Sequence, residues 1–508
     1  MTWLLVSPIL IPLAAAAVSF ALPERRMAQR AMAVGASALL LATSLLLLVQ
    51  VATRGMVVMQ AGDWPAPFGI TLIADHLAAI MVVISAIMAL ATAVYALVDI
   101  DPAREGLGYH PLFLVLVTGI NGAFLTGDLF NLYVWFEVLL ISSFVLLTLG
   151  NRRAQLEGGL TYVAVNLVSS LFFLVSIGVT YGLTGTLNMA DLAIALKDVP
   201  TDLVTTLSML FLVAFGIKAA IFPLFFWLPA SYHTPPVAIS AIFAGMLTKV
   251  GVYALLRAFT LLFTQDVSWT HNVLLWLAGA TMVTGVLGAA AQNEIRKILS
   301  FHIISQIGYM IMGLALFTPL ALAGAVFYLV HHIIVKANLF FVAGLVRRMG
   351  GSFDLKRLGG LYRHSPLLSI LFIVPAFSLA GFPPLSGFWA KLVLVLAGVE
   401  VGNGAIVAVA LVVGLLTIFS MTKIWQAAFW SPAPEGVTLS RLPQRRLWVP
   451  VAMLAGLTVV IGLFGAPFMN LAEASAAELL NPAGYVEAVL GADAAEAYAA
   501  PVAVEEAP

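Results

Sequence analysis

Long apolar segments separated by short polar connections run along most of the chain. A helix needs about 20 apolar residues to cross the roughly 30 Å hydrocarbon layer of a bilayer. Windows of that length lie at 2–21, 31–51, 75–98, 110–126, 128–149, 159–183, 204–228, 236–260, 270–291, 294–315, 320–346, 367–397, 404–428 and 447–470. This pattern predicts an all-α integral membrane protein with about fourteen transmembrane helices.

The connections between these segments differ in charge. With fourteen spans, the odd-numbered connections share one side of the membrane, and they hold sixteen of the 24 Lys and Arg residues. The even-numbered connections hold three, which are Arg54, Lys197 and Arg257. Cytoplasmic loops carry the excess of basic residues, so both termini are predicted to face away from the cytoplasm. Residues 471–508 contain seven acids and no Lys or Arg, as expected of an acidic non-cytoplasmic tail.

The composition argues against a soluble protein and against a nucleic-acid-binding protein. Hydrophobic residues make up 62% of the 508 residues and charged residues only 9%, with a net charge of zero. So few charges cannot cover a soluble protein of this size, and a neutral balance offers no surface for nucleic acid. Cysteine is absent, which excludes disulfides, iron–sulfur clusters and thiolate metal sites. We expect no enzyme activity of its own, no cofactor and no metal site.

Ionisable side chains inside the predicted spans are the most informative feature of the sequence. A charge at mid-bilayer costs about 2.5–3.5 kcal/mol on insertion scales. Lys423 lies near a span end, where it can reach the interface, but the other charges lie deeper. Side chains that merely tie membrane helices together are usually Ser, Thr or Asn. We therefore interpret the deeper group as functional: Glu137, Lys218, Lys249, His331, His332, Lys336 and Lys391.

These residue types favour proton transfer over cation binding. A protonated lysine cannot ligate a cation, whereas burial lowers the pKa of a lysine and a nearby carboxylate raises it. Movement of Glu137 relative to Lys218 would therefore load or release a proton. Histidine titrates near neutral pH and suits a relay, and His332 and Lys336 share one helix face. A hydrated chain of such groups is a proton path.

Two further histidines are weaker candidates. His233 lies in a predicted cytoplasmic loop, as either a proton uptake point or an ordinary loop residue. His302 lies in a span near Ser305 and Gln306, as either a relay or a tie between helices. Asp75 opens a span and is predicted to cap that helix.

Prolines mark an internal symmetry. Pro223 follows Lys218 in the seventh span, and Pro383 and Pro384 precede Lys391 in the twelfth. Proline breaks a helix, so both spans are predicted to be discontinuous. Because they are five spans apart, equivalent segments run in opposite directions, as in an inverted repeat. The predicted parts are helices 1–3 (1–105), a first five-helix repeat of spans 4–8 (106–262), a second of spans 9–13 (263–430), helix 14 (431–470) and the tail (471–508).

Five segments, in this order, resemble the antiporter-like subunits shared by respiratory complex I and the Mrp multisubunit Na+/H+ antiporters. They are TGDLFNLYVWFEVLLISSFVLL, FPLFFWLPASYHTPPVAISAIFAGMLTKVGVYALLR, KILSFHIISQIGYM, HHIIVKANLFF and GFPPLSGFWAK. The form of FNLYVWFE is similar to the D-type Mrp subunits. Lys391 stands where the M-type complex I subunit has a glutamate, but the N type also has a lysine there. A proton-pumping complex I subunit therefore remains the alternative.

The resemblance implies a proton-translocating membrane subunit of a Na+/H+ antiporter in the bacterial cell membrane. Its partners would be Mrp subunits of the A, B, C, E, F and G types, with H+ and Na+ as the transported ions. By resemblance, Glu137 is the fifth-helix glutamate that pairs with the seventh-helix Lys218, and Lys249 is the central lysine. The remaining matches are the eleventh-helix relay of His331, His332 and Lys336, and the terminal lysine, Lys391. The SYHTPP segment departs from the family form, which leaves the role of His233 open.

Overall fold

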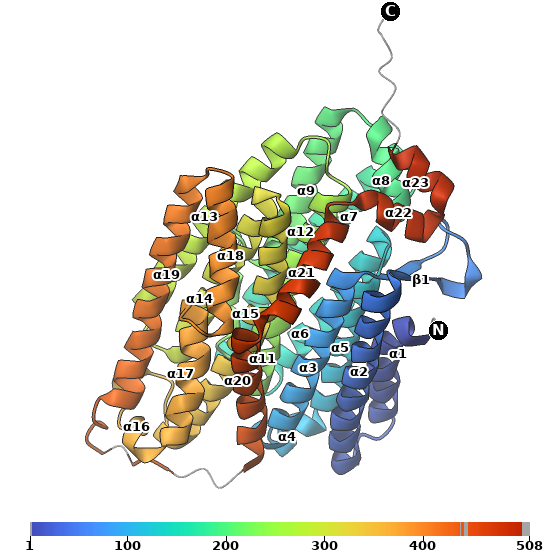
Figure 1. Cartoon of the computed structure of the whole chain (residues 1–508). Helices are drawn as coiled ribbons and strands as arrows, with labels where there is room; N and C mark the ends of the chain where they lie inside the picture. Colours follow the sequence, from blue (N-terminus) through green and yellow to red (C-terminus); the bar gives the residue numbers. More distant parts are fainter. Residues whose placement is uncertain (1–2, 437, 441–444, 500–508) are drawn as a thin grey trace, which may run out of the picture.

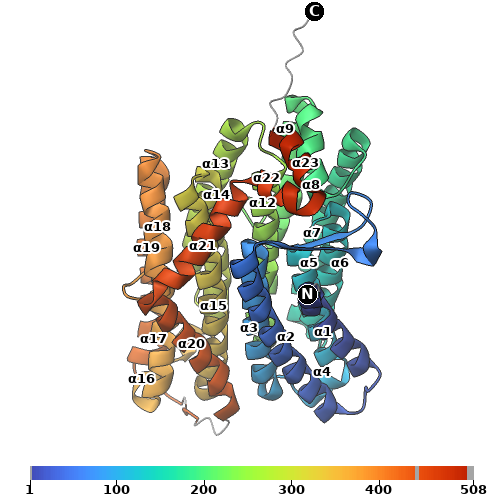
Figure 2. The same ribbon diagram turned by 45° about the vertical axis from the view of Figure 1, so that its right-hand side comes forward.

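The computed structural model describes residues 3–436, 438–440 and 445–499. Nearly all of them lie in helices that run between the two ends of the molecule (Figure 1, Figure 2). The first part of the chain comprises α1 (Trp3–Phe20), α2 (Arg26–Arg54), β1 (Val57–Gln60), η1 (Ala61–Asp63), β2 (Thr71–Ala74), α3 (His76–Asp99), α4 (Pro102–Gly106), α5 (Tyr109–Leu125) and α6 (Leu129–Thr148). Strands β1 and β2 form one antiparallel hairpin.

The middle of the chain continues in the same way. It comprises α7 (Arg153–Thr184), α8 (Met189–Ala195), η2 (Leu196–Asp198), α9 (Thr201–Ala219), α10 (Trp227–Ser231), α11 (Val237–Ile242), the π-helical turn η3 (Phe243–Leu247), α12 (Thr248–Leu261) and α13 (Val267–Ala291).

The last part contains the second set of long helices. It comprises α14 (Ile295–Leu316), α15 (Pro319–Gly350), η4 (Leu355–Arg357), α16 (Leu361–His364), α17 (Pro366–Ala380), α18 (Ser386–Glu400), α19 (Gly404–Ile424), η5 (Trp425–Trp430), η6 (Arg445–Leu447), α20 (Trp448–Leu463), α21 (Gly465–Leu479), α22 (Pro482–Leu490) and α23 (Ala492–Ala499).

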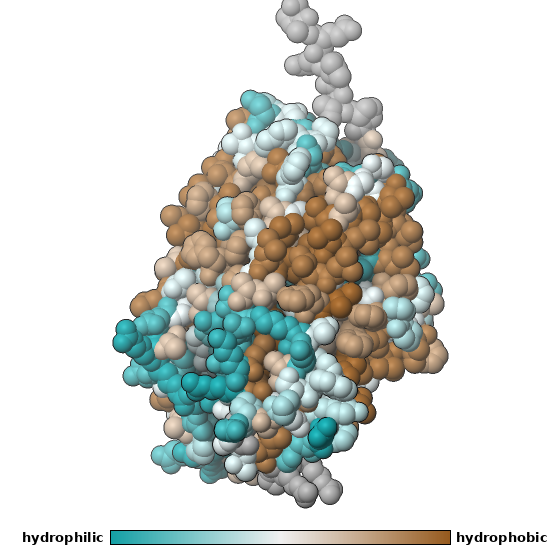
Figure 3. All heavy atoms as spheres, turned by 90° about the vertical axis from the view of Figure 1, so that its left-hand side faces the viewer, coloured by the Kyte–Doolittle hydropathy of each residue, from teal (hydrophilic) through white to brown (hydrophobic). Residues whose placement is uncertain are grey.

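Each predicted span coincides with one or more of these helices, which confirms the all-α membrane fold. Within the described ranges, eleven helices are long and apolar enough to cross a bilayer, or twelve if the bent pair α20–α21 is one span. The apolar helices α5 and α17 are shorter. The count of fourteen therefore stays a prediction. Figure 3 shows apolar residues in a broad band across one face, with polar residues gathered toward its lower end.

Burial separates central helices from peripheral ones. The apolar window of α15 is 100% buried, and those of α14 and of the continuous segment Val237–Leu261 are 94% buried. The corresponding value for α2 is 28%. Helices α14, α15 and α11–α12 therefore form the centre. The candidate residues that they carry must find polar surroundings inside the protein, because a buried polar group without a partner is costly.

Both predicted helix breaks are present. Helix α9 ends at Ala219, Ala220 takes a left-handed conformation (φ 60°), and the chain resumes as α10 at Trp227. Helix α17 ends at Ala380, Gly381 has φ 96°, and α18 begins at Ser386. Pro223 lies in the first break and Pro383 and Pro384 in the second, where the missing proline N–H groups prevent a continuous helix.

A short backbone pairing recurs on opposite ends of the molecule. Asp128, the N-cap of α6, forms a β-bridge with Asn188, and Glu294, the N-cap of α14, forms one with Asp354. The two bridges are 166 residues apart at both partners. Figure 1 shows α8, which follows Asn188, at one end and α16, which follows Asp354, at the other. The recurrence fits an inverted repeat, whose residue limits stay a prediction.

The last predicted span, 447–470, is not one straight helix. The chain bends by 81° between α20 and α21, and α21 then runs obliquely across the molecule (Figure 2). Near its end, Glu478 accepts a hydrogen bond from the backbone N–H of His76 (2.8 Å) and contacts its Nδ1 (2.7 Å). The described part of the acidic tail is therefore helical and packed against the body rather than a loose appendage.

Candidate functional site

Glu137 lies on α6 at the edge of the candidate site. Its carboxylate accepts a hydrogen bond from the hydroxyl of Ser170 on α7 and is only partly buried. The adjacent residue, Phe136, turns its ring toward Lys218, whose Nζ is 5.7 Å from the ring centroid. Within the described part of the chain, Glu137 and Lys218 form no direct ion pair. The charges of Glu137 and Lys218 nevertheless interact, so their pairing stays a prediction. The direct hydrogen-bond partner of Glu137 is a serine that the sequence did not reveal.

Lys218 occupies the last turn of α9, directly before the break. Its side chain lines a pocket with Tyr162, Asn166 and Trp227. Gly251 on α12 also lines this pocket. It lets α12 approach α9 closely, because a Cβ there would lie 2.5 Å from the backbone nitrogen of Ala219. Among residues 3–436, 438–440 and 445–499, the Lys218 Nζ has no hydrogen-bond partner, and the residue is half-buried.

Lys249 lies at the centre of the molecule. It is fully buried and follows the π-helical turn η3. Its Nζ donates a hydrogen bond to the backbone carbonyl of Ala244 (2.6 Å). Its ionisable neighbours are His332 and Lys336 on α15, which places α12 and α15 in electrostatic contact across the central layer.

Helix α15 carries the densest part of the site. His331, His332 and Lys336 are all essentially inaccessible. The Nζ of Lys336 donates to the carbonyl of Leu299 on α14 (3.3 Å). Neither ring nitrogen of His332 has a partner in the described structure, and the same is true of both nitrogens of His302 on α14. A buried polar atom without a partner is costly, so these unpaired imidazoles call for a polar neighbour such as water.

A hydroxyl bridge links His331 to the second helix break. The Nδ1 of His331 is 2.8 Å from the Oγ of Ser386, and that oxygen is 3.0 Å from the Oγ of Ser378. Ser378 also accepts a hydrogen bond from the backbone N–H of Gly387 (3.1 Å). The close approach depends on Gly387, because a Cβ there would meet the carbonyl oxygen of Ser378 at 1.8 Å.

Lys391 lies beyond this bridge on α18. Its Nζ donates to the carbonyl of Ala380 (3.0 Å), which the break leaves without a helical partner, and lies 5.3 Å from the ring centroid of Tyr309. Tyr309 stacks on Tyr328, with centroids 5.2 Å apart. The Tyr328 hydroxyl donates to Gln306 (2.5 Å). The site therefore includes tyrosines and serines that sequence reasoning missed.

The two breaks carry different side chains at equivalent positions. The left-handed residues Ala220 and Gly381 occupy the same place in the two breaks, because the backbone hydrogen bonds around them match. Lys218 is two residues before Ala220, and Leu379 is two residues before Gly381. Lys391 is ten residues after Gly381, and Ala230 is ten residues after Ala220. Each of these two lysines therefore has an apolar residue at the matching position of the other break.

His233 lies apart from the central row, in the loop between α10 and α11. Its Nδ1 is 2.9 Å from the carbonyl oxygen of Pro229. Burial, followed by the charges of Lys297 and Arg296, lowers the pKa of His233 to about 4. The imidazole is therefore neutral at physiological pH.

The residues from Glu137 to Lys391 thus lie on six neighbouring helices, α6, α9, α12, α14, α15 and α18. Lysines and histidines dominate this row, and Glu137 is its one predicted carboxylate. Among the described residues, no group of three His, Asp or Glu side chains gathers in a way that would hold a metal ion. The chemistry that these groups can perform without a metal is the gain and loss of protons.

Comparisons with known proteins identify relatives that are antiporter subunits. A family model described as NADH:quinone oxidoreductase/Mrp antiporter, TM, matches residues 126–417. The D-type subunit of the Na+/H+ antiporter of Alkalihalophilus pseudofirmus is 45% identical over 488 residues, which cover 96% of this chain and 99% of that protein.

Solved structures agree with this similarity. A chain of the Mrp complex from Dietzia sp. matches with a TM-score of 0.91 at 33% identity, over 96% of this chain and 99% of that chain. A chain of respiratory complex I from Thermus thermophilus matches with a TM-score of 0.81 over 94% of this chain and 99% of that chain. Its 24% identity makes it a likeness of fold alone.

Proposed function

The chain belongs to the NADH:quinone oxidoreductase/Mrp antiporter family, and from this premise we propose that it is the proton-translocating subunit of a multisubunit Na+/H+ antiporter. Protons move along Glu137, Lys218, Lys249, the α15 relay and Lys391. The observation that carries the proposal is the row of ionisable side chains on the central helices. Such residues are costly inside a membrane and usually mark an ion or proton pathway. Relatives named as antiporter subunits supply the class of ion exchange.

The lysine contacts suit groups that change charge. The Nζ atoms of Lys249, Lys336 and Lys391 donate to backbone carbonyls rather than to carboxylates. A carbonyl accepts a hydrogen bond from either an ammonium or a neutral amine. Each lysine can therefore release a proton without losing its structural partner, which a lysine locked to a carboxylate cannot do at low cost.

The histidines supply the transfer steps between the lysines. Five ring nitrogens of His302, His331 and His332 have no partner in the described structure. A neutral imidazole accepts a proton on one nitrogen and releases one from the other. Water held at these nitrogens would satisfy them and join them into one path. On this view His302 is a relay, and Ser378 and Ser386 are positioning groups for His331.

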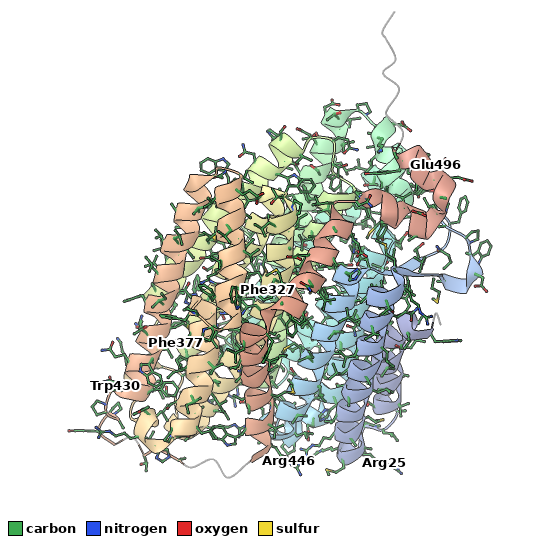
Figure 4. All side chains as sticks on the ribbon, viewed as in Figure 1. Arg25, Phe327, Phe377, Trp430, Arg446 and Glu496 are labelled. Atoms are coloured by element: carbon green, nitrogen blue, oxygen red, sulfur yellow. The ribbon has the colours of Figure 1, made fainter. Side chains whose placement is uncertain are left out.

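Coupling to Na+ is electrostatic in this proposal. A proton that enters the row changes the charge beside its neighbours, and these charges act over short distances in a poorly solvated interior. The cation path lies elsewhere in an assembly with the A, B, C, E, F and G types of subunit. Both termini face away from the cytoplasm of a bacterial cell. In support, Figure 4 shows Arg25 and Arg446 at one end of the molecule and Glu496 at the opposite end.

The test is reconstitution of the purified assembly in vesicles that contain a pH-sensitive dye. An imposed Na+ gradient is expected to move protons in the opposite direction, and a choline gradient of equal size is expected to move none. The alternative, a redox-driven complex I subunit, predicts flavin and iron–sulfur partners in the purified assembly and proton movement driven by NADH. Proton movement driven by NADH and indifferent to Na+ would replace our proposal with that alternative.

A prediction for His233 tests whether it takes part. Because the pKa of His233 is about 4, its imidazole does not titrate between about pH 6 and pH 8. We expect His233→Gln to keep the antiport rate within about twofold of the wild type and to leave the pH profile unchanged. The measurement is the rate of dye response in vesicles across this pH range. A profile displaced in the variant would instead make His233 the proton uptake point.

A further inference from the structure

A basic cavity opens at the end of the molecule that carries α4 and α16 (Figure 1). Its volume is about 510 Å³. The ends of α3, α7, α14 and α15 form its wall, so it lies where the membrane-spanning helices reach the membrane surface. Five of its lining residues are arginines and one is an acid: Arg104, Arg152, Arg296, Arg347, Arg348 and Asp99.

The carboxylates at this cavity compensate only part of the positive charge. Asp99 accepts from Arg348 (3.3 Å), Glu294 from Arg296 (3.2 Å), and Asp101 pairs with Arg104. Arg152 and Arg347 have no carboxylate partner among the residues that the structure describes. The cavity therefore keeps an excess of positive charge.

Aromatic packing holds two of the like charges close together. The guanidinium carbons of Arg296 and Arg347 lie 3.8 Å and 5.0 Å from the centroid of the same ring, that of Phe353. Cation–π contact orients each guanidinium, but the positive charge of Arg347 acts on that of Arg296, and the two repel one another. An anion between the arginines would relieve that repulsion.

We infer that this cavity is a binding site for a phosphate group. Arginine presents a planar fork of donors that matches the oxygens of a phosphate and binds them in pairs. The site lies at the depth where phospholipid headgroups meet helix ends, and the cytoplasmic leaflet is rich in anionic lipid. The chemistry fits two sources, the headgroup of an anionic phospholipid and free inorganic phosphate.

The site also borders the path to the central lysine. Thr234, Pro235, Pro236 and Val237 line the cavity, and Val237 begins the helical segment that leads to Lys249. A bound anion would offset the positive potential that opposes proton approach along this wall. This last consequence rests on the proposed function, but the binding site itself does not.

Ligand-dependent thermal stability of the purified assembly, stripped of anionic lipid, tests the site. The probes are short-chain phosphatidylglycerol against phosphatidylcholine, and inorganic phosphate against chloride at equal ionic strength. The variant is Arg152→Gln with Arg347→Gln, two side chains without hydrogen-bond partners in the described structure. The matched control is Arg153→Gln, because Arg153 is 92% exposed and pairs with Glu157 outside the cavity.

The expected result is stabilisation of the wild type and the Arg153→Gln control by phosphatidylglycerol. In the double variant, half-maximal stabilisation should require about tenfold more ligand. Stabilisation by phosphatidylglycerol alone identifies a lipid headgroup, and stabilisation by phosphate as well identifies the phosphate group itself. Equal responses in wild type and double variant, or no response to either probe, would overturn the inference. Because binding is read without transport, an inactive assembly that still shows this pattern would refute only the proposed function.

Discussion

Replacement of Lys218 by alanine is expected to abolish Na+-driven proton movement while the subunit still inserts and assembles. The side chain lies at the break of α9, between Glu137 and the central lysine, so its loss interrupts the path. A positioned proton-transfer group contributes about 10²- to 10⁴-fold, so we expect antiport below about 1% of the wild-type rate. The measurement is the dye response of reconstituted vesicles, normalised to the amount of assembled complex.

Stability distinguishes a lost function from a lost fold. The Lys218 Nζ makes no hydrogen bond in the described structure, so its removal leaves no partner unsatisfied and relieves the cost of a confined charge. The thermal midpoint of the Lys218→Ala assembly should therefore equal or exceed that of the wild type. Glu137→Ala is expected to abolish antiport in the same way.

Lys423→Ala is the matched control. Like Lys218, Lys423 lies in the last turn of a helix, but its Nζ donates to the carbonyls of Ala290 (3.1 Å) and Gln292 (2.6 Å) at the end of α13. Loss of the Lys423 side chain should lower stability slightly and leave antiport intact. Lys218→Ala is expected to do the opposite, that is, to abolish antiport without lowering stability. Normal antiport by an assembled Lys218→Ala variant would remove Lys218 from the proton path.

Replacement of Arg257 by leucine is expected to destabilise the subunit strongly. Its Nη2 lies 2.5 Å from Oδ2 of Asp75, and the two side chains are only 8% and 1% exposed. The guanidinium also packs between the rings of Tyr253 and Tyr485. Loss of one partner leaves a buried, unpaired carboxylate, which costs about 3–5 kcal/mol. We expect a lower thermal midpoint and less assembled complex in the membrane.

A second substitution tests this cause. Asp75 caps α3, because its Oδ1 accepts a hydrogen bond from the N–H of Ala78 (2.8 Å). Asparagine keeps a capping oxygen and removes the charge. Asp75→Asn combined with Arg257→Leu should therefore recover most of the lost stability. If the double variant is as unstable as Arg257→Leu, the buried charge is not the cause.

The sequence predicted those features that depend on local composition. Hydropathy predicted the spans, and Pro223, Pro383 and Pro384 predicted both helix breaks. Hydropathy and proline positions can both be read from a short window of sequence. The Asp75 cap is equally local and is confirmed. The bend of 81° after α20 was missed, because an apolar window reports length and not direction.

Pairings between distant segments were beyond a single sequence. Arg257 was counted among loop cations, but it lies within α12 and pairs with Asp75, 182 residues away. Glu137 was expected to pair with Lys218, and the two charges do interact, but the hydrogen bond that Ser170 donates to Glu137 was not foreseen. Such contacts depend on how helices pack, and a serine carries no charge that would draw attention to it. The proton-transfer roles of these residues stay predictions.

The difference between the two helix breaks has a consequence for direction. Two identical halves related by a two-fold axis in the membrane plane would offer the same proton affinity to both compartments, and nothing in the protein would distinguish inside from outside. In this comparison, Lys218 corresponds to Leu379, and Lys391 corresponds to Ala230. These four side chains make the two breaks unequal. On the proposed pathway, the direction of proton movement would therefore depend on these side-chain differences and not on the backbone that the two predicted repeats share.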